Sequence, residues 1–124
     1  MATEIEIEAG GVTLSATLNN SSTAKALADA MPIEAAANLW GDEIYFSTAV
    51  SHPLEEDAVE IVEVGDLAYW PSGKGFCIFF GPTPMSQGEE IRPASAVNLV
   101  GSVDGDATLL KQVEHGAAVT VRVR

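Results

Sequence analysis

The sequence predicts a mainly β domain in which about eight short strands form a closed or nearly closed antiparallel barrel capped by two short helices. Polar and apolar residues alternate along many short segments that are separated by turn residues, which is typical of half-buried strands. The helical patterns are too few to cover both faces of an open sheet, and the strands are too closely spaced for βαβ units. A barrel fits this pattern because closure removes unpaired strand edges.

The first two strands are predicted by strict alternation. The segment TEIEIE (residues 3–8) places Ile5 and Ile7 on one face and its acids on the other. Gly10-Gly11 is a hairpin turn signal, and VTLSATL (residues 12–18) alternates again. We therefore expect these two strands to pair.

A short helix is predicted over residues 23–31. Asparagine and serine at residues 19–22 offer N-caps, apolar residues follow at helical spacing, and Pro32 ends the run. The next stretch, PIEAAANLW (residues 32–40), fits either another turn of helix or a strand.

The remaining elements are mostly strands. Residues 41–50, 58–66 and 67–71 are predicted as three of them, and GFCIFFG (residues 75–81) as a central strand because it is apolar on both faces. Residues 83–95 are expected to form a loop. The last three elements are predicted as a strand over residues 96–103, a short helix over 107–114 and a strand over 117–124.

Composition limits the classes of partner. The chain has 124 residues, the size of one domain (residues 1–124), and its net charge is -12 from 18 acidic and 6 basic residues. Nucleic acid and anionic membranes are not expected as partners, because both require clustered Lys and Arg. Cys77 is the only cysteine, so no intramolecular disulfide can form. No signal-peptide pattern is visible near residue 1, and we expect a cytoplasmic protein.

Three long motifs carry a resemblance to a known family: WGDEIYFST (residues 40–48), VGDLAYWPSGKGFCIFFGPTPMS (residues 64–86) and IRPASAVNLVGSV (residues 91–103). They resemble a family of small, uncharacterised bacterial and archaeal cyclophilin-like proteins, and the resemblance covers most of the chain. It implies the cyclophilin-like fold, an eight-stranded β-barrel with a helix at each end.

The resemblance also raises peptidyl-prolyl cis-trans isomerisation as an activity. True cyclophilins use an arginine from a Phe-His-Arg motif on a central strand, which is followed by Phe-Met-x-Gln. The corresponding strand here, IYFSTAV (residues 44–50), has Ser47 or Thr48 near that position, and no arginine precedes Phe80. A neutral hydroxyl does not replace a charged, forked donor, so efficient isomerase activity is not expected.

Arg92 is the one candidate for a catalytic cation. In a cyclophilin, the residues just before the strand that matches AVNLVGSV line the active-site face, so the resemblance places Arg92 near a cleft. The alternative is a surface arginine paired with Glu89 or Glu90.

The candidate ligand-binding residues surround the most apolar strand. Tyr45, Trp70 and Phe80 are candidate aromatic walls, although for Phe80 the sequence favours core packing. Met85 belongs to the proline-stiffened loop PTPMS, which either flanks a cleft or plugs the barrel end. Asn98 is an amide inside an apolar run, so it either joins strands or faces a pocket. With Arg92, these residues form the predicted cleft on the outer face of the barrel.

No metal or cofactor is expected. Neither His52 nor His115 has companions at metal-ligand spacing, and no glycine-rich phosphate loop appears. Adjacent carboxylates such as Asp42-Glu43 are interpreted as solvated loops, and Cys77 as inert packing. The preferred hypothesis is a module that binds a small molecule or a short proline-containing peptide. A prolyl isomerase with a non-standard site and a subunit of a larger bacterial enzyme assembly are the alternatives.

Overall fold

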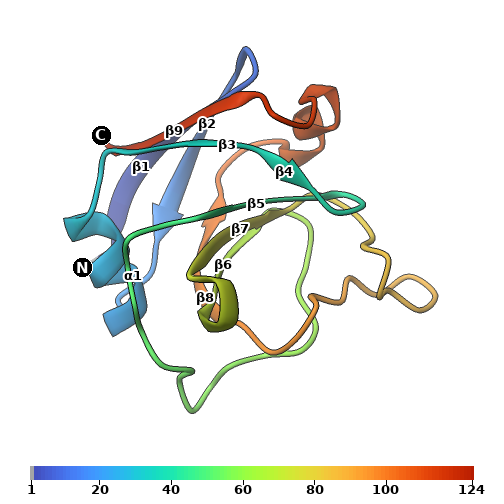
Figure 1. The fold of residues 1–124 in the computed structure, drawn as a ribbon, viewed down its shortest axis with the longest axis horizontal. Helices are drawn as coiled ribbons and strands as arrows, with labels where there is room; N and C mark the ends of the chain where they lie inside the picture. Colours follow the sequence, from blue (N-terminus) through green and yellow to red (C-terminus); the bar gives the residue numbers. More distant parts are fainter. Residues whose placement is uncertain (1) are drawn as a thin grey trace.

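The computed structural model describes residues 2–124, which form one antiparallel sheet curved into a nearly closed barrel (Figure 1). The strand order is β3-β9-β1-β2-β8-β6-β7-β5-β4. The prediction of a mainly β barrel is confirmed, although the described residues contain nine strands rather than eight. Their bounds are β1 Thr3–Ala9, β2 Val12–Leu18, β3 Ile33–Ala36, β4 Asn38–Leu39, β5 Glu43–Ser47, β6 Asp66–Trp70, β7 Gly75–Phe79, β8 Asn98–Val103 and β9 Ala118–Val123.

The first hairpin forms as the alternation predicts. β1 and β2 pair from Thr3–Leu18 to Ala9–Val12, and Gly10 and Gly11 turn the chain with φ of 51° and 88°. A positive φ at both turn residues matches the twist of the flanking strands, and glycine adopts it without strain. The isoleucines of β1 are fully buried.

One segment closes the barrel. β3 pairs with β9 and β4 pairs with β5, so the two ends of the sheet are consecutive parts of the same chain, separated by the buried Ala37. The segment changes its partner at this alanine. The ambiguous stretch PIEAAANLW is therefore mostly strand. Because this one segment forms both edge strands, the two ends of the sheet lie close together.

The predicted strand over residues 58–66 is wrong. The segment makes two isolated bridges, Val59–Val97 and Val62–Ile91, and Asp66 already belongs to β6. The physical reason lies in the sheet: β8 pairs with β2 and β6, and β6 pairs with β7 and β8, so both edges of these strands are occupied. The alternating residues 58–64 cross the outer surface instead.

Three short helices accompany the barrel, and Figure 1 shows α1 and η2 on opposite sides of it. α1 (Ser22–Asp29) begins where Ser21 accepts a hydrogen bond from the backbone N–H of Ala24. The second predicted helix is a 3-10 helix, η2 (Ala107–Gln112), and a 3-10 turn, η1 (Pro71–Gly73), joins β6 to β7. Within residues 2–124, no helix is long and apolar enough to cross a lipid bilayer.

Buried side chains form two clusters, one inside the barrel and one outside it. β7 is buried along its whole length, as expected for a central strand. Phe76 and Ile78 face the interior cluster, where the rings of Phe46 and Phe76 stack with centroids 5.3 Å apart. Cys77 and Phe79 point the other way into the outer cluster. The outer cluster, which the loops cross, forms the floor of the candidate site.

Candidate functional site

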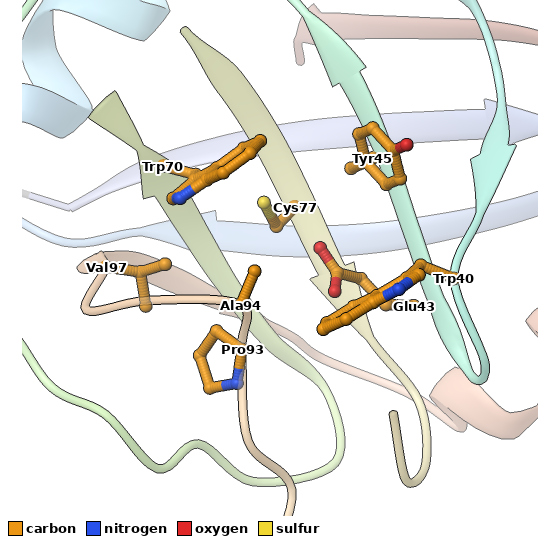
Figure 2. Close-up of a pocket in the computed structure, with 8 residues that line it drawn as sticks. All are labelled: Trp40, Glu43, Tyr45, Trp70, Cys77, Pro93, Ala94 and Val97. Atoms are coloured by element: carbon orange, nitrogen blue, oxygen red, sulfur yellow. The ribbon is translucent and has the colours of Figure 1, made fainter. Parts of the chain in front are cut away.

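A cavity of about 200 Å³ opens on the outer face of β5, β6 and β7 (Figure 2). We call it the aromatic pocket. Strands and two loops supply its lining: Trp40, Glu43, Tyr45, Trp70, Cys77, Pro93, Ala94 and Val97.

Strand alternation brings the pocket side chains to one face. Glu43 and Tyr45 are two residues apart on β5, and Tyr45 lies opposite Cys77 on β7 in the strand register. Trp70 ends β6, opposite Gly75. Since side chains of residues two apart share a face, these four point outward together.

The indole of Trp70 is held in place on both sides. A Cβ added at Gly73 would lie 2.7 Å from Cζ3 of the ring, so the indole packs closely on this glycine and a side chain here would have to displace it. Its Nε1–H donates to Oγ of Ser95 at 2.7 Å. This hydrogen bond fixes the ring between β6 and the loop that carries Pro93 and Ala94, and the aromatic wall is preorganised.

Glu43 is the polar group of the pocket. Its side chain is 5% exposed, and within residues 2–124 its Oε1 is a buried oxygen with no hydrogen-bond partner. Burial raises the pKa of Glu43 to about 7 from its ordinary value of 4.5, and the Cys77 thiol opposes part of the rise. The same burial raises the pKa of Cys77 well above its ordinary value. The pocket therefore holds a carboxyl that can gain or lose a proton near neutral pH.

The loop PTPMS shapes the far wall through its hydroxyls. Oγ of Ser86 accepts hydrogen bonds from the backbone N–H of Thr83 at 2.9 Å and of Arg92 at 3.1 Å. The Thr83 hydroxyl donates to the backbone carbonyl of Arg92. These contacts tie the two ends of the loop together next to Pro93, which lines the pocket.

Met85 and Arg92 line a second, adjoining cavity of about 300 Å³ that shares Pro93 and Ala94 with the aromatic pocket. Nε of Arg92 donates to Oε2 of Glu90 at 2.7 Å. This hydrogen bond lowers the pKa of the Glu90 carboxyl. The guanidinium is thus paired with Glu90, one of the two acids that the sequence predicts as its surface partners.

Phe80 and Asn98 do not reach the aromatic pocket. Phe80 follows the outward-facing Phe79, so it turns inward and joins the interior cluster at 3% exposure. Asn98 lies opposite Tyr69, an interior residue, and it is 1% exposed. Of the two roles open to this amide, the structure assigns it the joining of chain segments.

The sequence does not predict six of the lining residues as site residues: Trp40, Glu43, Cys77, Pro93, Ala94 and Val97. Trp40 lies in the turn that precedes β5, within a motif that carries the family resemblance. Glu43 was read as part of a solvated loop. Its spacing of two residues from Tyr45 was the available signal, because the strand pattern places both side chains on the same face.

The family comparison agrees with this architecture. The model of the Cyclophilin-like family matches residues 3–122. The chain belongs to the cyclophilin-like family. A solution structure of the hypothetical protein AF2241 from Archaeoglobus fulgidus superposes with a TM-score of 0.83 at 42% sequence identity, covering 98% of this chain and 95% of that one. No curated protein matches the chain.

In this cyclophilin-like chain, the two residues near the position of the missing arginine make structural hydrogen bonds. Oγ of Ser47 donates to the carbonyl of Gly73 at 3.1 Å, and Oγ1 of Thr48 donates to the carbonyl of Lys74 at 2.9 Å. Both hydroxyls tie β5 to the turn between β6 and β7. Among the described residues, no group of three or more His, Cys, Asp or Glu side chains is arranged to hold a metal ion.

Proposed function

We propose that this cyclophilin-like protein is a binding module that takes a small molecule, or one side chain of a short peptide, in the aromatic pocket. The observation that carries the proposal is the buried Glu43 oxygen without a hydrogen-bond partner, set among three aromatic side chains. A largely apolar cavity with a few directed polar groups is the usual form of a ligand site.

The free-energy cost of leaving the buried Glu43 oxygen without a hydrogen bond supports a ligand site over plain side-chain packing. An unsatisfied buried acceptor costs about 1–3 kcal/mol. A ligand that donates a hydrogen bond to Glu43 recovers that cost on binding. Apolar packing alone would favour an aliphatic residue at this position.

The size of the pocket limits the ligand. Its volume of about 200 Å³ is below the roughly 300–1,000 Å³ of sites for drug-sized molecules. The expected occupant is therefore a small metabolite or a single amino-acid side chain. Proline is one side chain of this size, which keeps a proline-containing peptide within the proposal.

Isomerase catalysis has less support. Within the described residues, the lining of the aromatic pocket includes no arginine or lysine. Arg92 lines the adjoining cavity and is paired with Glu90. The arginine that donates to the prolyl nitrogen in true cyclophilins has no cationic counterpart among the side chains that line this pocket.

The test is an NMR screen of small fragments read at the indole N–H signals of Trp40 and Trp70. We expect bound fragments to shift both signals, and Trp70→Ala to weaken binding by about tenfold or more, since buried aromatic anchors contribute about 2 kcal/mol. Met85→Ala, in the adjoining cavity, serves as the control and should leave binding unchanged. The proposal fails if no fragment shifts either indole, or if Trp70→Ala binds as well as the parent protein.

A further inference from the structure

The carboxyl of Glu43 and the pocket aromatics form one continuous lining. Figure 2 shows the carboxyl beside the indole of Trp40 and directed into the space that Trp70 and Ala94 bound on the other side. Aromatic faces carry partial negative charge and attract cations. An acid and three aromatic rings around one small cavity therefore share a preference for positive charge.

The charged groups around the pocket do not compete for Glu43. Tyr45 and Cys77 are the other titratable groups of its lining, and neither is cationic. Two cations of neighbouring segments are paired with other acids: Arg92 with Glu90 at 2.7 Å, and Lys111 with Asp42 at 4.0 Å. The net charge of -12 raises the local concentration of cations around the protein. An ionised Glu43 thus has no counter-charge within the described pocket.

We infer that the aromatic pocket selects small organic cations, with an ammonium group at Glu43 and its apolar stem against Trp40, Tyr45 and Trp70. This inference rests on the proposed binding function and names the class of ligand. The shared chemistry is an ammonium on an alkyl stem, which either a free amine or the lysine side chain of a peptide supplies.

Ligand charge and pH separate this inference from simple apolar binding. The pKa of about 7 leaves Glu43 mostly protonated at pH 5.5 and mostly ionised at pH 8.5. An alkylammonium, like lysine, stays charged at both pH values. If only the ionised pocket binds it well, the affinity should fall by about 30-fold from pH 8.5 to pH 5.5.

The experiment compares n-butylammonium with the uncharged n-butanol by NMR titration at the two indole signals. At pH 8.5 we expect n-butylammonium to bind at least tenfold more tightly, and the preference to disappear at pH 5.5. Glu43→Gln should bind both probes equally at either pH. Glu34→Gln is the matched control, because it removes one exposed acid on β3 that lies outside the pocket lining, and it should keep the preference.

A second arm distinguishes the source of the ammonium. The peptide acetyl-Gly-Lys-Gly-amide is compared with its norleucine counterpart, which has a similar stem without the charge. Tighter binding of the lysine peptide than of n-butylammonium would support a peptide ligand, and the reverse order would support a free amine.

Three results would overturn the inference. The first is n-butanol binding as tightly as n-butylammonium at pH 8.5. The second is the norleucine peptide binding as tightly as the lysine peptide, and the third is a preference for cations that persists in Glu43→Gln. In each case the indoles still report a ligand, so the binding function stands. If Glu43→Gln does not fold, the pH dependence of the parent protein provides the same test. Failure of the binding function is a different result, in which no fragment shifts the indoles.

Discussion

At the scale of single residues, Glu43 combines two conflicting requirements. Its backbone pairs opposite Phe79 in the sheet, so the strand holds the side chain on the outer face. There it is 5% exposed and lines the aromatic pocket together with Pro93 and Ala94. A buried carboxyl reduces its desolvation cost by binding a proton, which is the cause of its raised pKa.

The stability of the protein should therefore depend on the protonation of Glu43. Because the folded pKa lies above the ordinary value of 4.5, this group's favourable contribution is complete below pH 4.5 and is lost as the pH rises through about 7. At 1.36 kcal/mol per pKa unit, the loss amounts to about 3 kcal/mol. Urea unfolding from pH 4 to pH 8 should show Glu43→Gln gaining stability over the parent protein as the pH rises.

The exposed Glu34 on β3 supplies the control for this measurement. Glu34→Gln should follow the parent protein at every pH, because its carboxyl is solvated. Parallel curves for Glu43→Gln and the parent protein would contradict the prediction.

At the scale of elements, one buried amide anchors the long loop between β5 and β6. The side-chain amide of Asn98 donates to the carbonyl of Pro53 at 3.0 Å and to Oγ1 of Thr23 at 3.1 Å. Its oxygen accepts from the backbone N–H of Glu55 at 2.7 Å. Asn98 thus joins β8, α1 and a loop of irregular structure.

Removal of this anchor should be costly. Asn98→Ala removes three hydrogen bonds, and at about 1 kcal/mol for each we expect it to destabilise the protein by about 3 kcal/mol. Hydrogen exchange should show faster exchange of the Glu55 amide. Asn38→Ala, which removes a single hydrogen bond to the carbonyl of Tyr45, is the matched variant and should cost about 1 kcal/mol. Equal losses for the two variants would contradict the anchoring role.

Prediction from the sequence succeeded where a pattern is local. The β1–β2 hairpin needs only alternation and two glycines, and both were visible. The segment over residues 58–66 alternates as well, but its failure to form a strand depends on the occupied edges of β6 and β8. No local pattern reports which edges of a sheet are free.

For the candidate site, too, prediction from the sequence succeeded where the pattern is local. Tyr45 and Trp70 were identified because aromatic side chains at strand positions suit pocket walls. Phe80 lies in the interior cluster, so its core-packing alternative holds; the sequence left both roles open because β7, which it follows, is apolar on both faces. Glu43 was missed because adjacent acids before a strand resemble a solvated loop, and the pocket that it lines with Pro93 is assembled from segments distant in the sequence.

At the scale of the whole molecule, the described lining of the aromatic pocket on this cyclophilin-like barrel holds no arginine or lysine. We expect no acceleration of cis-trans exchange in a proline-containing tetrapeptide, because Arg92 is engaged by Glu90 and lies outside the aromatic pocket. Exchange NMR with purified protein measures this directly. Exchange broadening that disappears in Arg92→Ala would contradict the expectation and establish a non-standard isomerase.

The position of the pocket within the chain has a practical consequence. All residues that line it fall between Trp40 and Val97, whereas β1, β2, β3 and β9 contribute none of them (Figure 1). These four strands, which we call the frame, lie outside the pocket lining. The segment between Trp40 and Val97 carries the surface that can be varied. A combinatorial library restricted to the outward positions of β5, β6 and β7 would therefore sample new ligand specificities while the inner packing of the frame stays intact.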